Sequence, residues 1–225
     1  MIKFNDVSKA YNSHCALDSV TLAIGKGEFV SIVGQSGAGK STLLKLLIAE
    51  ERPTTGTIFL NDEDITALPH NELPFLRRKI GTIFQDFKLL PHKTASENVA
   101  FAMEVVGREK KEIQEDVMSI LELVGLEQKA KQFPHELSGG EQQRVAIARA
   151  LVHQPDIIIA DEPTGNLDPL STWDIIRLLM KIHELGTTII LATHDREIIN
   201  TLSKRVISLD RGKVVRDEQN GRYIL

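Results

Sequence analysis

The sequence contains one cysteine and no hydrophobic run long enough to cross a bilayer. Cys15 cannot form an internal disulfide, which favours a reducing compartment and a packing role for its side chain. The longest apolar runs, 157–160 and 189–192, fall far short of the ~20 residues that a membrane-spanning helix needs. The N-terminal residues do not form a cationic and apolar leader. We therefore expect a cytosolic chain that reaches a membrane only through a partner.

An excess of basic residues is absent as well. The formal net charge is −4, and no basic arm or stripe stands out, which argues against a protein that binds nucleic acid. Internal repeats, low-complexity tracts and flexible linkers are also lacking. With 225 residues, of which 42% are hydrophobic, the chain can bury a core, and we expect one domain with a smaller lobe.

What the sequence does contain is a complete phosphate-binding loop at residues 34–41. The apolar residues 28–33 predict a buried strand before the loop, and residues 42–48 predict the apolar face of a helix after it. Glycines let the backbone curl around phosphates, and the N-terminus of the helix directs N–H groups at them. Lys40 would reach the β- and γ-phosphates, and the Ser41 hydroxyl would ligate Mg²⁺. The predicted nucleotide-binding residues are Gly34, Gln35, Ser36, Gly37, Ala38, Gly39, Lys40, Ser41 and Thr42.

The distribution of apolar residues predicts an α/β fold. Alternation in the first thirty residues predicts a small antiparallel sheet. Later strands separated by helical segments indicate a mainly parallel sheet with helices on both faces. From 94 to 132 the pattern is helical, which predicts an inserted helical lobe, and residues 171–174 carry a capping pattern that predicts a helix start. The later strands are expected at 57–60, 80–84, 157–160, 187–192 and 205–209.

Two carboxylates follow one of the expected strands. Asp161 and Glu162 come directly after residues 157–160, at the edge of a parallel sheet where such folds bind ligands. Asp161 would hold the hydration shell of Mg²⁺, and Glu162 would accept a proton from an attacking water molecule. A solvated acidic turn is the structural alternative, and the phosphate loop in the same chain favours the catalytic interpretation.

A second anion-binding pattern opens the helical run 145–152. Ser138, Gly139, Gly140 and Glu141 place a hydroxyl and glycine N–H groups at a helix N-terminus, although a capped helix with a glycine-rich entry is the structural alternative. Together with the phosphate loop, this segment resembles the signature of the ATP-binding cassette (ABC) family, and the resemblance spans essentially the whole chain. It implies that two such domains pack head to tail as a homodimer on ATP binding. The Ser138 cradle of one copy would then close on the ATP held by the other.

The resemblance also implies a division of the chain. Residues 1–93 and 136–225 would form a RecA-like core with an antiparallel β-subdomain, and residues 94–135 would form the helical lobe. The signature at 137–141 would lie at the edge of that lobe. The expected fold is thus an ABC-type nucleotide-binding domain of the P-loop class, within a single domain of residues 1–225.

Four further residues match functional positions of the family. Gln85 matches the glutamine that touches Mg²⁺ and water, and His194 matches the histidine that contacts the γ-phosphate and organises Glu162. Asp168 lies in the segment that matches the loop crossing the dimer interface, and Tyr11 matches the aromatic residue that stacks on adenine. Each alone has a structural alternative, such as a solvated glutamine, a structural histidine or an aromatic residue at the edge of a turn.

The sequence also separates branches of the family. A DNA-repair cassette ATPase would carry a long coiled coil, and a translation factor would contain two cassettes, whereas neither feature is present. Residues 75–81, 84–91, 94–100 and 160–168 are similar to those of cassette ATPases that work with a membrane protein in bacterial cell division. The alternatives are the ATPase of a lipoprotein-releasing or macrolide-type exporter and, third, a cassette ATPase acting on nucleic acid.

An apolar cluster marks the expected contact with the membrane subunit. Phe87, Leu89, Leu90 and Pro91 lie in a connection that should be exposed beside the helical lobe. In the family, a short helix of an integral membrane subunit docks there, while packing against the lobe is the structural alternative. The resemblance therefore implies a peripheral protein at the cytoplasmic face of the bacterial membrane, at the division septum.

Overall fold

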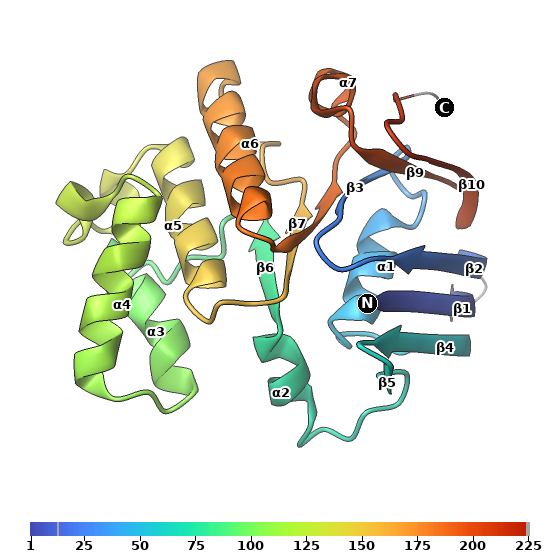
Figure 1. Cartoon of the computed structure of the whole chain (residues 1–225), viewed down its shortest axis with the longest axis horizontal. Coiled ribbons are helices and arrows are strands. Elements are labelled where there is room, and N and C mark those ends of the chain that lie inside the picture. Colours follow the sequence, from blue (N-terminus) through green and yellow to red (C-terminus); the bar gives the residue numbers. More distant parts are fainter. Residues whose placement is uncertain (13, 224–225) are drawn as a thin grey trace. The chain divides into compact units, whose positions relative to one another are not determined.

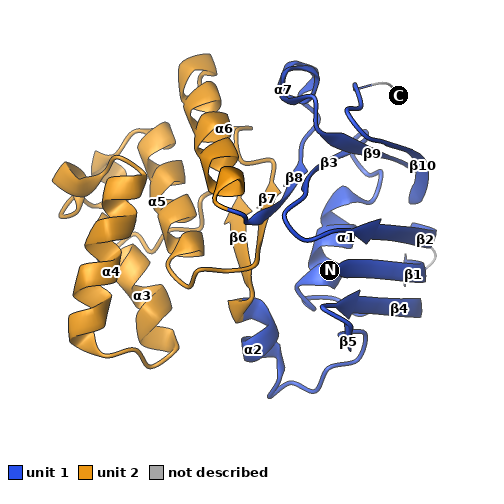
Figure 2. Cartoon of the chain, viewed as in Figure 1, with its two compact units in different colours: residues 1–77, 186–225 blue, residues 78–185 orange. Residues whose placement is uncertain are grey.

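The computed structural model describes residues 1–12 and 14–223, which form two compact units (Figure 2). Unit 1 comprises Met1–Arg77 and Gly186–Leu225, and unit 2 comprises Arg78–Leu185. The helix α2 (Leu73–Arg78) ends at their boundary, and Figure 1 labels most of the elements along the chain. No helix among the described residues combines the length and the apolar character needed to span a membrane.

Unit 1 contains a four-stranded antiparallel sheet in the order β2-β1-β4-β5. Its strands are β1 (Ile2–Tyr11), β2 (His14–Ile24), β4 (Thr55–Leu60) and β5 (Glu63–Asp64). Along β1, Ile2, Phe4 and Val7 are buried while the residues between them are exposed, so one face packs inward and the other meets solvent. The antiparallel sheet predicted from the alternation is confirmed.

The second sheet of unit 1 supports the phosphate loop. Its strands run in the order β10-β9-β3-β8, where β3 pairs in parallel with both β8 and β9, and β10 closes an antiparallel hairpin with β9. Every residue of β3 and β8 is buried, which explains why these strands appear in the sequence as continuous apolar runs. The elements are β3 (Phe29–Val33), β8 (Thr188–Ala192), β9 (Arg205–Asp210), β10 (Lys213–Glu218), α1 (Lys40–Leu47) and α7 (Arg196–Leu202).

Unit 2 joins a parallel strand pair to a group of helices. The strand β6 (Ile80–Phe84) pairs with β7 (Ile157–Asp161), and the sequence predicted both strands to within one residue. The helix α3 packs against α4 and α5 (Figure 1), and α3 and α4 lie in the region where the apolar spacing predicted helices. The helices are α3 (Ala95–Val105), α4 (Lys110–Leu123), α5 (Gly139–Leu151) and α6 (Pro169–Glu184), with short 3₁₀ turns at Glu127–Lys129 and Pro134–Glu136.

The start of α6 differs from the sequence prediction. The capping pattern at 171–174 predicted a helix start there, but α6 begins at Pro169. The carboxylate of Asp168 caps it by accepting hydrogen bonds from the backbone N–H groups of Leu170 and Ser171, both at 3.0 Å. Proline is favoured at the first helical position because its ring presets φ and its missing N–H would find no partner there. The start of α6 is therefore set by Asp168 and Pro169 and not by the later Ser171.

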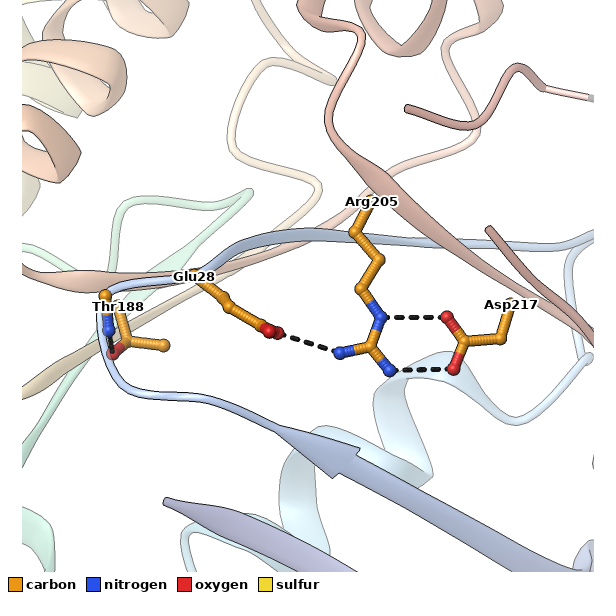
Figure 3. Close-up of polar contacts among 5 residues, drawn as sticks. Glu28, Thr188, Arg205 and Asp217 are labelled. Carbon is orange, nitrogen blue, oxygen red and sulfur yellow. Dashed lines mark hydrogen bonds and ion pairs between the residues drawn. The ribbon is translucent and has the colours of Figure 1, made fainter. Parts of the chain in front are cut away.

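An ion-pair cluster fastens the second sheet of unit 1 (Figure 3). Arg205, at the start of β9, donates two parallel hydrogen bonds to Asp217 of β10, at 2.8 and 2.7 Å, and a third to Glu28 before β3, at 2.8 Å. The contact with Asp217, aided by Glu28, raises the pKa of the guanidinium, whose side chain is only 11% exposed. Nearby, the Gly27 N–H donates to the Thr188 hydroxyl at 2.9 Å and ties the start of β3 to β8.

Replacing Arg205 with methionine should lower the free energy of unfolding by about 1–3 kcal/mol, because it leaves two partly buried carboxylates without their cation. The matched control is Lys213→Met, which removes an exposed ion pair with Asp18 and should cost less than about 0.5 kcal/mol. Urea unfolding followed by circular dichroism measures both variants. Equal unfolding midpoints would show that the Arg205 cluster contributes no more than an ordinary surface pair.

Candidate functional site

The phosphate loop connects β3 to α1 in unit 1. Gly39 is the N-cap of α1 with φ 106°, and a Cβ atom at this position would lie 2.6 Å from the carbonyl oxygen of Ala16. A side chain is therefore excluded both by the backbone conformation and by the close approach of β2. Gly34 is similarly confined, since a Cβ there would lie 2.4 Å from the carbonyl oxygen of Leu209. The glycine spacing thus reflects two contacts of the loop with neighbouring strands.

Lys40 is the first residue of α1, and its side chain lies inside the loop. The residue is 9% exposed, and its ammonium group donates to the carbonyl oxygens of Gly34 at 2.8 Å and Gln35 at 3.3 Å. The first turn of α1 contains no acidic residue, so the positive end of the helix dipole is not neutralised locally. Lysine and dipole together favour an anion. Of the other predicted loop residues, Ser36 and Ser41 are among those exposed to solvent, while Ala38 is buried and Thr42 is half-buried.

His194 follows the strand next to the phosphate loop. Ile32 of β3 pairs with Ala192 of β8, and the Thr193 N–H donates to the Ile32 carbonyl at 3.2 Å. Gly34 and His194 therefore follow adjacent parallel strands, and each lies two residues after the paired positions Ile32 and Ala192. The His194 side chain is exposed. Unit 1 thus brings together the two segments that sequence reasoning assigned to the γ-phosphate.

Gln85, Asp161 and Glu162 lie at the ends of the strand pair in unit 2. Phe84 of β6 pairs with Asp161 of β7, so Gln85 and Glu162 each follow a paired position. Glu162 has φ 48°, a left-handed conformation that costs a residue with a side chain about 1–3 kcal/mol. Such strain persists only where the surrounding structure enforces it, and it concentrates at functional sites. Other turn residues, such as Asp62 and Gln154, have the same conformation, so the backbone marks Glu162 as a constrained position but does not by itself separate it from an acidic turn.

Gln85 is held by a residue that sequence reasoning treated only as part of a loop. Its amide nitrogen donates to the Asn166 side-chain oxygen at 3.1 Å, and the Asn166 amide nitrogen donates to the Gln85 carbonyl at 3.1 Å. Gly165 lies against the same side chain, where a Cβ would come within 2.8 Å of the Gln85 amide nitrogen. The segment at Gln85 and the segment at 165–166 are thereby joined to each other close in sequence to Glu162.

The signature segment begins α5. Ser138 is the N-cap, its hydroxyl accepts from the Glu141 N–H, and the Glu141 carboxylate accepts from the Ser138 N–H at 2.8 Å. Lys129 also pairs with Glu141, and this hydrogen bond, with those from Ser138, lowers the pKa of the Glu141 carboxyl to about 2. A Cβ on Gly140 would lie 2.8 Å from the Ser171 hydroxyl, so close packing against α6 explains one glycine of the pair. Gly139 is half-buried beside it.

Sequence reasoning missed the residues that hold the apolar connection after Gln85. Arg149, in the last turn of α5, donates to the carbonyl oxygens of Lys88 at 2.5 Å and Phe87 at 2.9 Å, and its partial burial lowers the pKa of the guanidinium. Phe87 and Lys88 both have positive φ, at 58° and 53°. The arginine therefore stabilises a bend that these residue types would not adopt alone.

Asn98 of α3 holds the other half of this connection. It is completely buried, accepts from the Leu90 N–H at 2.7 Å, and donates to the carbonyl oxygens of Leu90 at 3.1 Å and Lys93 at 2.9 Å. A polar residue within the apolar stripe formed by Ala95 and Val99 was the one signal in the sequence that could have identified it. Phe87, Leu89 and Leu90 are partly buried and Pro91 is exposed.

Comparison with known proteins gives consistent results. The family described as ABC transporter matches residues 17–165. The cell division ATP-binding protein FtsE of Bacillus subtilis (strain 168) is 53% identical over 224 residues, which cover 99% of this chain and 98% of that protein. FtsE of Mycobacterium tuberculosis (strain ATCC 25618 / H37Rv) is 50% identical over 225 residues, covering 99% and 98% of the two chains.

Among solved structures, the dimeric post-hydrolysis state of the ATP-binding cassette MJ0796, bound to ADP and Pi, has a TM-score of 0.89. It is 39% identical in sequence and covers 99% of this chain and 100% of its own. This similarity confirms the α/β cassette fold predicted from the sequence.

Proposed function

Because this chain belongs to the ABC transporter family, we propose that it is the ATPase subunit of a membrane complex that acts in cell division together with an FtsX-like integral membrane protein. It binds and hydrolyses ATP. The observation that carries the division-specific part is the similarity to FtsE along the full length of both chains. The motif residues named from the sequence show no departure from the family pattern at a catalytic position.

Binding of the triphosphate is assigned to the loop and helix of unit 1. The Lys40 ammonium and the N–H groups at the start of α1 would bind the phosphates, with His194 near the terminal one. Tyr11, at the end of β1, would stack on the adenine, and the residue is 37% exposed. These roles are supported by the buried ammonium and by the helix N-terminus without local acidic residues.

Hydrolysis is assigned to the strand ends of unit 2. The Glu162 carboxylate would orient the attacking water and take up its proton, while His194 would organise that carboxylate. Gln85 would position the same water through its side chain, which Asn166 orients. The strained backbone of Glu162 supports this role.

The proposed Mg²⁺ ligands are the Ser41 hydroxyl, the Gln85 amide oxygen and the Asp161 carboxylate. All three are oxygen donors, which suits a cation that prefers oxygen and retains water ligands. The amide nitrogen of Gln85 is the atom bonded to Asn166, which leaves the amide oxygen for the cation. Within residues 1–12 and 14–223, no three histidine, cysteine, aspartate or glutamate side chains cluster as a dedicated metal cage would require. When bound, Mg²⁺ would neutralise charge on the phosphates.

We further propose that ATP binding joins two copies of the chain. Ser138, Gly139, Gly140 and Glu141 of one copy would cover the ATP held by the other, and Asp168 would lie in the loop at that interface. The MJ0796 cassette is described as dimeric, which supports this arrangement. The proposed moving parts are a core of residues 1–93 and 136–225 and a helical lobe of residues 94–135.

The proposed docking surface comprises Phe87, Leu89, Leu90 and Pro91. Asn98 and Arg149 hold this segment through hydrogen bonds to its backbone atoms, and Phe87, Leu89 and Leu90 are only partly buried. A connection fixed through its backbone can present apolar side chains to a short helix of the membrane subunit. This contact would place the protein at the cytoplasmic face of the membrane, at the septum.

Replacing Leu89 and Leu90 with aspartate should release the protein from membranes that contain the FtsX-like subunit, because two charges would have to be buried in the contact. Cells that carry only this variant should fail to complete septa and should lengthen. ATP binding by the purified variant should stay within about 2-fold of the unsubstituted protein, since its backbone hydrogen bonds remain. Co-sedimentation, cell length and nucleotide titration measure the three effects.

The control for this double variant is Leu185→Asp, which adds a charge at an apolar residue that is already 71% exposed in the same unit. It should co-sediment normally. Unchanged co-sedimentation of the double variant would place these leucines in the lobe's own packing. Normal division combined with loss of an exported substrate would instead favour the exporter alternative.

A further inference from the structure

The side chain of Lys9 lies beneath the ring of Tyr11. Its ammonium is 4.8 Å from the ring centroid, and it donates to the Glu51 carboxylate and to the Arg52 carbonyl, each at 2.8 Å. The side chain is only 13% exposed, which is unusual for lysine and requires that the charge be paired. An ammonium has three N–H donors, and here two are used in hydrogen bonds below the aromatic face.

The partners of Lys9 come from the segment that follows α1. The Glu50 N–H donates to the Lys45 carbonyl at 2.9 Å, so this segment continues from the helix through backbone hydrogen bonds. Lys9 lowers the pKa of the Glu51 carboxyl through its hydrogen bond and its charge, and the Tyr11 hydroxyl makes a smaller contribution. Lys9 thus links the end of β1 to an acidic residue next to the helix that begins with Lys40.

Backbone contacts fasten the end of β1 to the same segment. The Ala10 N–H donates to the Thr54 hydroxyl at 3.0 Å, and the Thr54 N–H donates to the Ser8 carbonyl at 2.7 Å. An aromatic ring at an exposed strand end would ordinarily sample several rotamers, and binding would have to restrict them at a cost. Here these contacts fix the backbone next to Tyr11, and the Lys9 ammonium lies against the ring itself.

We infer that Lys9 is a positioning residue for the nucleotide base: it fixes the Tyr11 ring so that the opposite face can stack on the purine, and it couples that ring to the helix that binds the phosphates. The inference rests on the proposed role of Tyr11 in adenine binding. A cation on one face of an aromatic ring is attracted to it and leaves the other face for the base. Loss of the ammonium frees the ring while the phosphate loop remains unchanged.

The test measures ATP and inorganic tripolyphosphate binding to the purified full-length chain by isothermal titration calorimetry. Lys9→Met should weaken ATP binding by about 3- to 10-fold, because the ring must then be ordered by the ligand. Tripolyphosphate binding should change by less than about 2-fold, since it lacks a base and uses only the phosphate loop. Lys9→Arg, which keeps a cation over the ring, should restore most of the ATP affinity.

Two further variants make the test specific. Lys3→Met removes an exposed ion pair with Asp62 from the same strand and should not alter ATP affinity. In a Tyr11→Ala background, Lys9→Met should cause no additional loss, because the two residues act through one contact.

Equal loss of ATP and tripolyphosphate binding in Lys9→Met would overturn the inference, since it would indicate a general effect on the α1 region. Unchanged ATP affinity in Tyr11→Ala would also overturn it, by removing the stacking that Lys9 is said to support. The ATPase assignment would survive either result as long as Lys40→Ala still abolishes ATP binding.

Discussion

Glu162→Gln should retain ATP binding and lower the rate of hydrolysis by about 10²- to 10⁴-fold, which is the range that a positioned general base contributes. Glutamine keeps the size of the side chain and can tolerate the same backbone, but it cannot accept the proton of the attacking water. The φ of 48° at this residue shows that the chain is held in a strained conformation here. In the proposed role, Glu162 would act only after the nucleotide is bound, so the affinity for ATP and the rate of hydrolysis should change independently.

Lys40→Ala should fail in a different way, by losing measurable ATP binding. Its ammonium is the buried positive charge within the phosphate loop, and alanine replaces it with no donor. Nucleotide titration and phosphate release distinguish the two variants, with Glu184→Gln at the end of α6 as a control for removal of an acidic residue elsewhere. A similar fall in affinity in both variants would contradict the role assigned to Glu162.

A mixture of Lys40→Ala and Ser138→Arg chains should regain ATP-dependent pairing that neither variant shows alone. If Ser138 serves the ATP of the other copy, each heterodimer contains one intact site and one site with both defects. The arginine would fill the anion cradle at the start of α5 with a bulky side chain and would remove the hydroxyl that accepts from the Glu141 N–H. Pairing should therefore depend on which chains are combined.

Size-exclusion chromatography with and without Mg-ATP measures this effect, and Glu162→Gln supplies the reference because it should hold its ATP. Lys40→Ala mixed with itself is the matched control, since it has the same concentration and no intact site. If the mixture elutes as its separate components, the phosphate loop and the Ser138 segment that bind one ATP would have to belong to the same chain. A Glu162→Gln sample that stays monomeric with ATP would contradict pairing of the isolated subunit altogether.

Prediction from sequence was accurate where the signal is local. The strands at 80–84 and 157–160 depend on consecutive apolar residues, whose burial period can be read directly. The error at the start of α6 was also local, because Pro169 carried the correct signal and the later serine was given more weight. In each case the physical cause lies within one or two turns of chain.

The amino-acid sequence by itself determined that this protein has an α/β fold and a phosphate-binding loop, because glycine spacing and apolar periodicity constrain the backbone over short distances. The resemblance of its motifs to the ABC family then implied an ATPase. Only the tertiary structure decided how the site residues are held: Gln85 by Asn166, 81 positions away, Phe87 by Arg149, 62 positions away, and Lys9 by Glu51, 42 positions away. Such contacts form when separate elements pack, and each uses a common polar residue that could equally be solvated. No local sequence pattern tells whether such a side chain will bond to a distant element or remain in solvent, because that depends on how the chain folds.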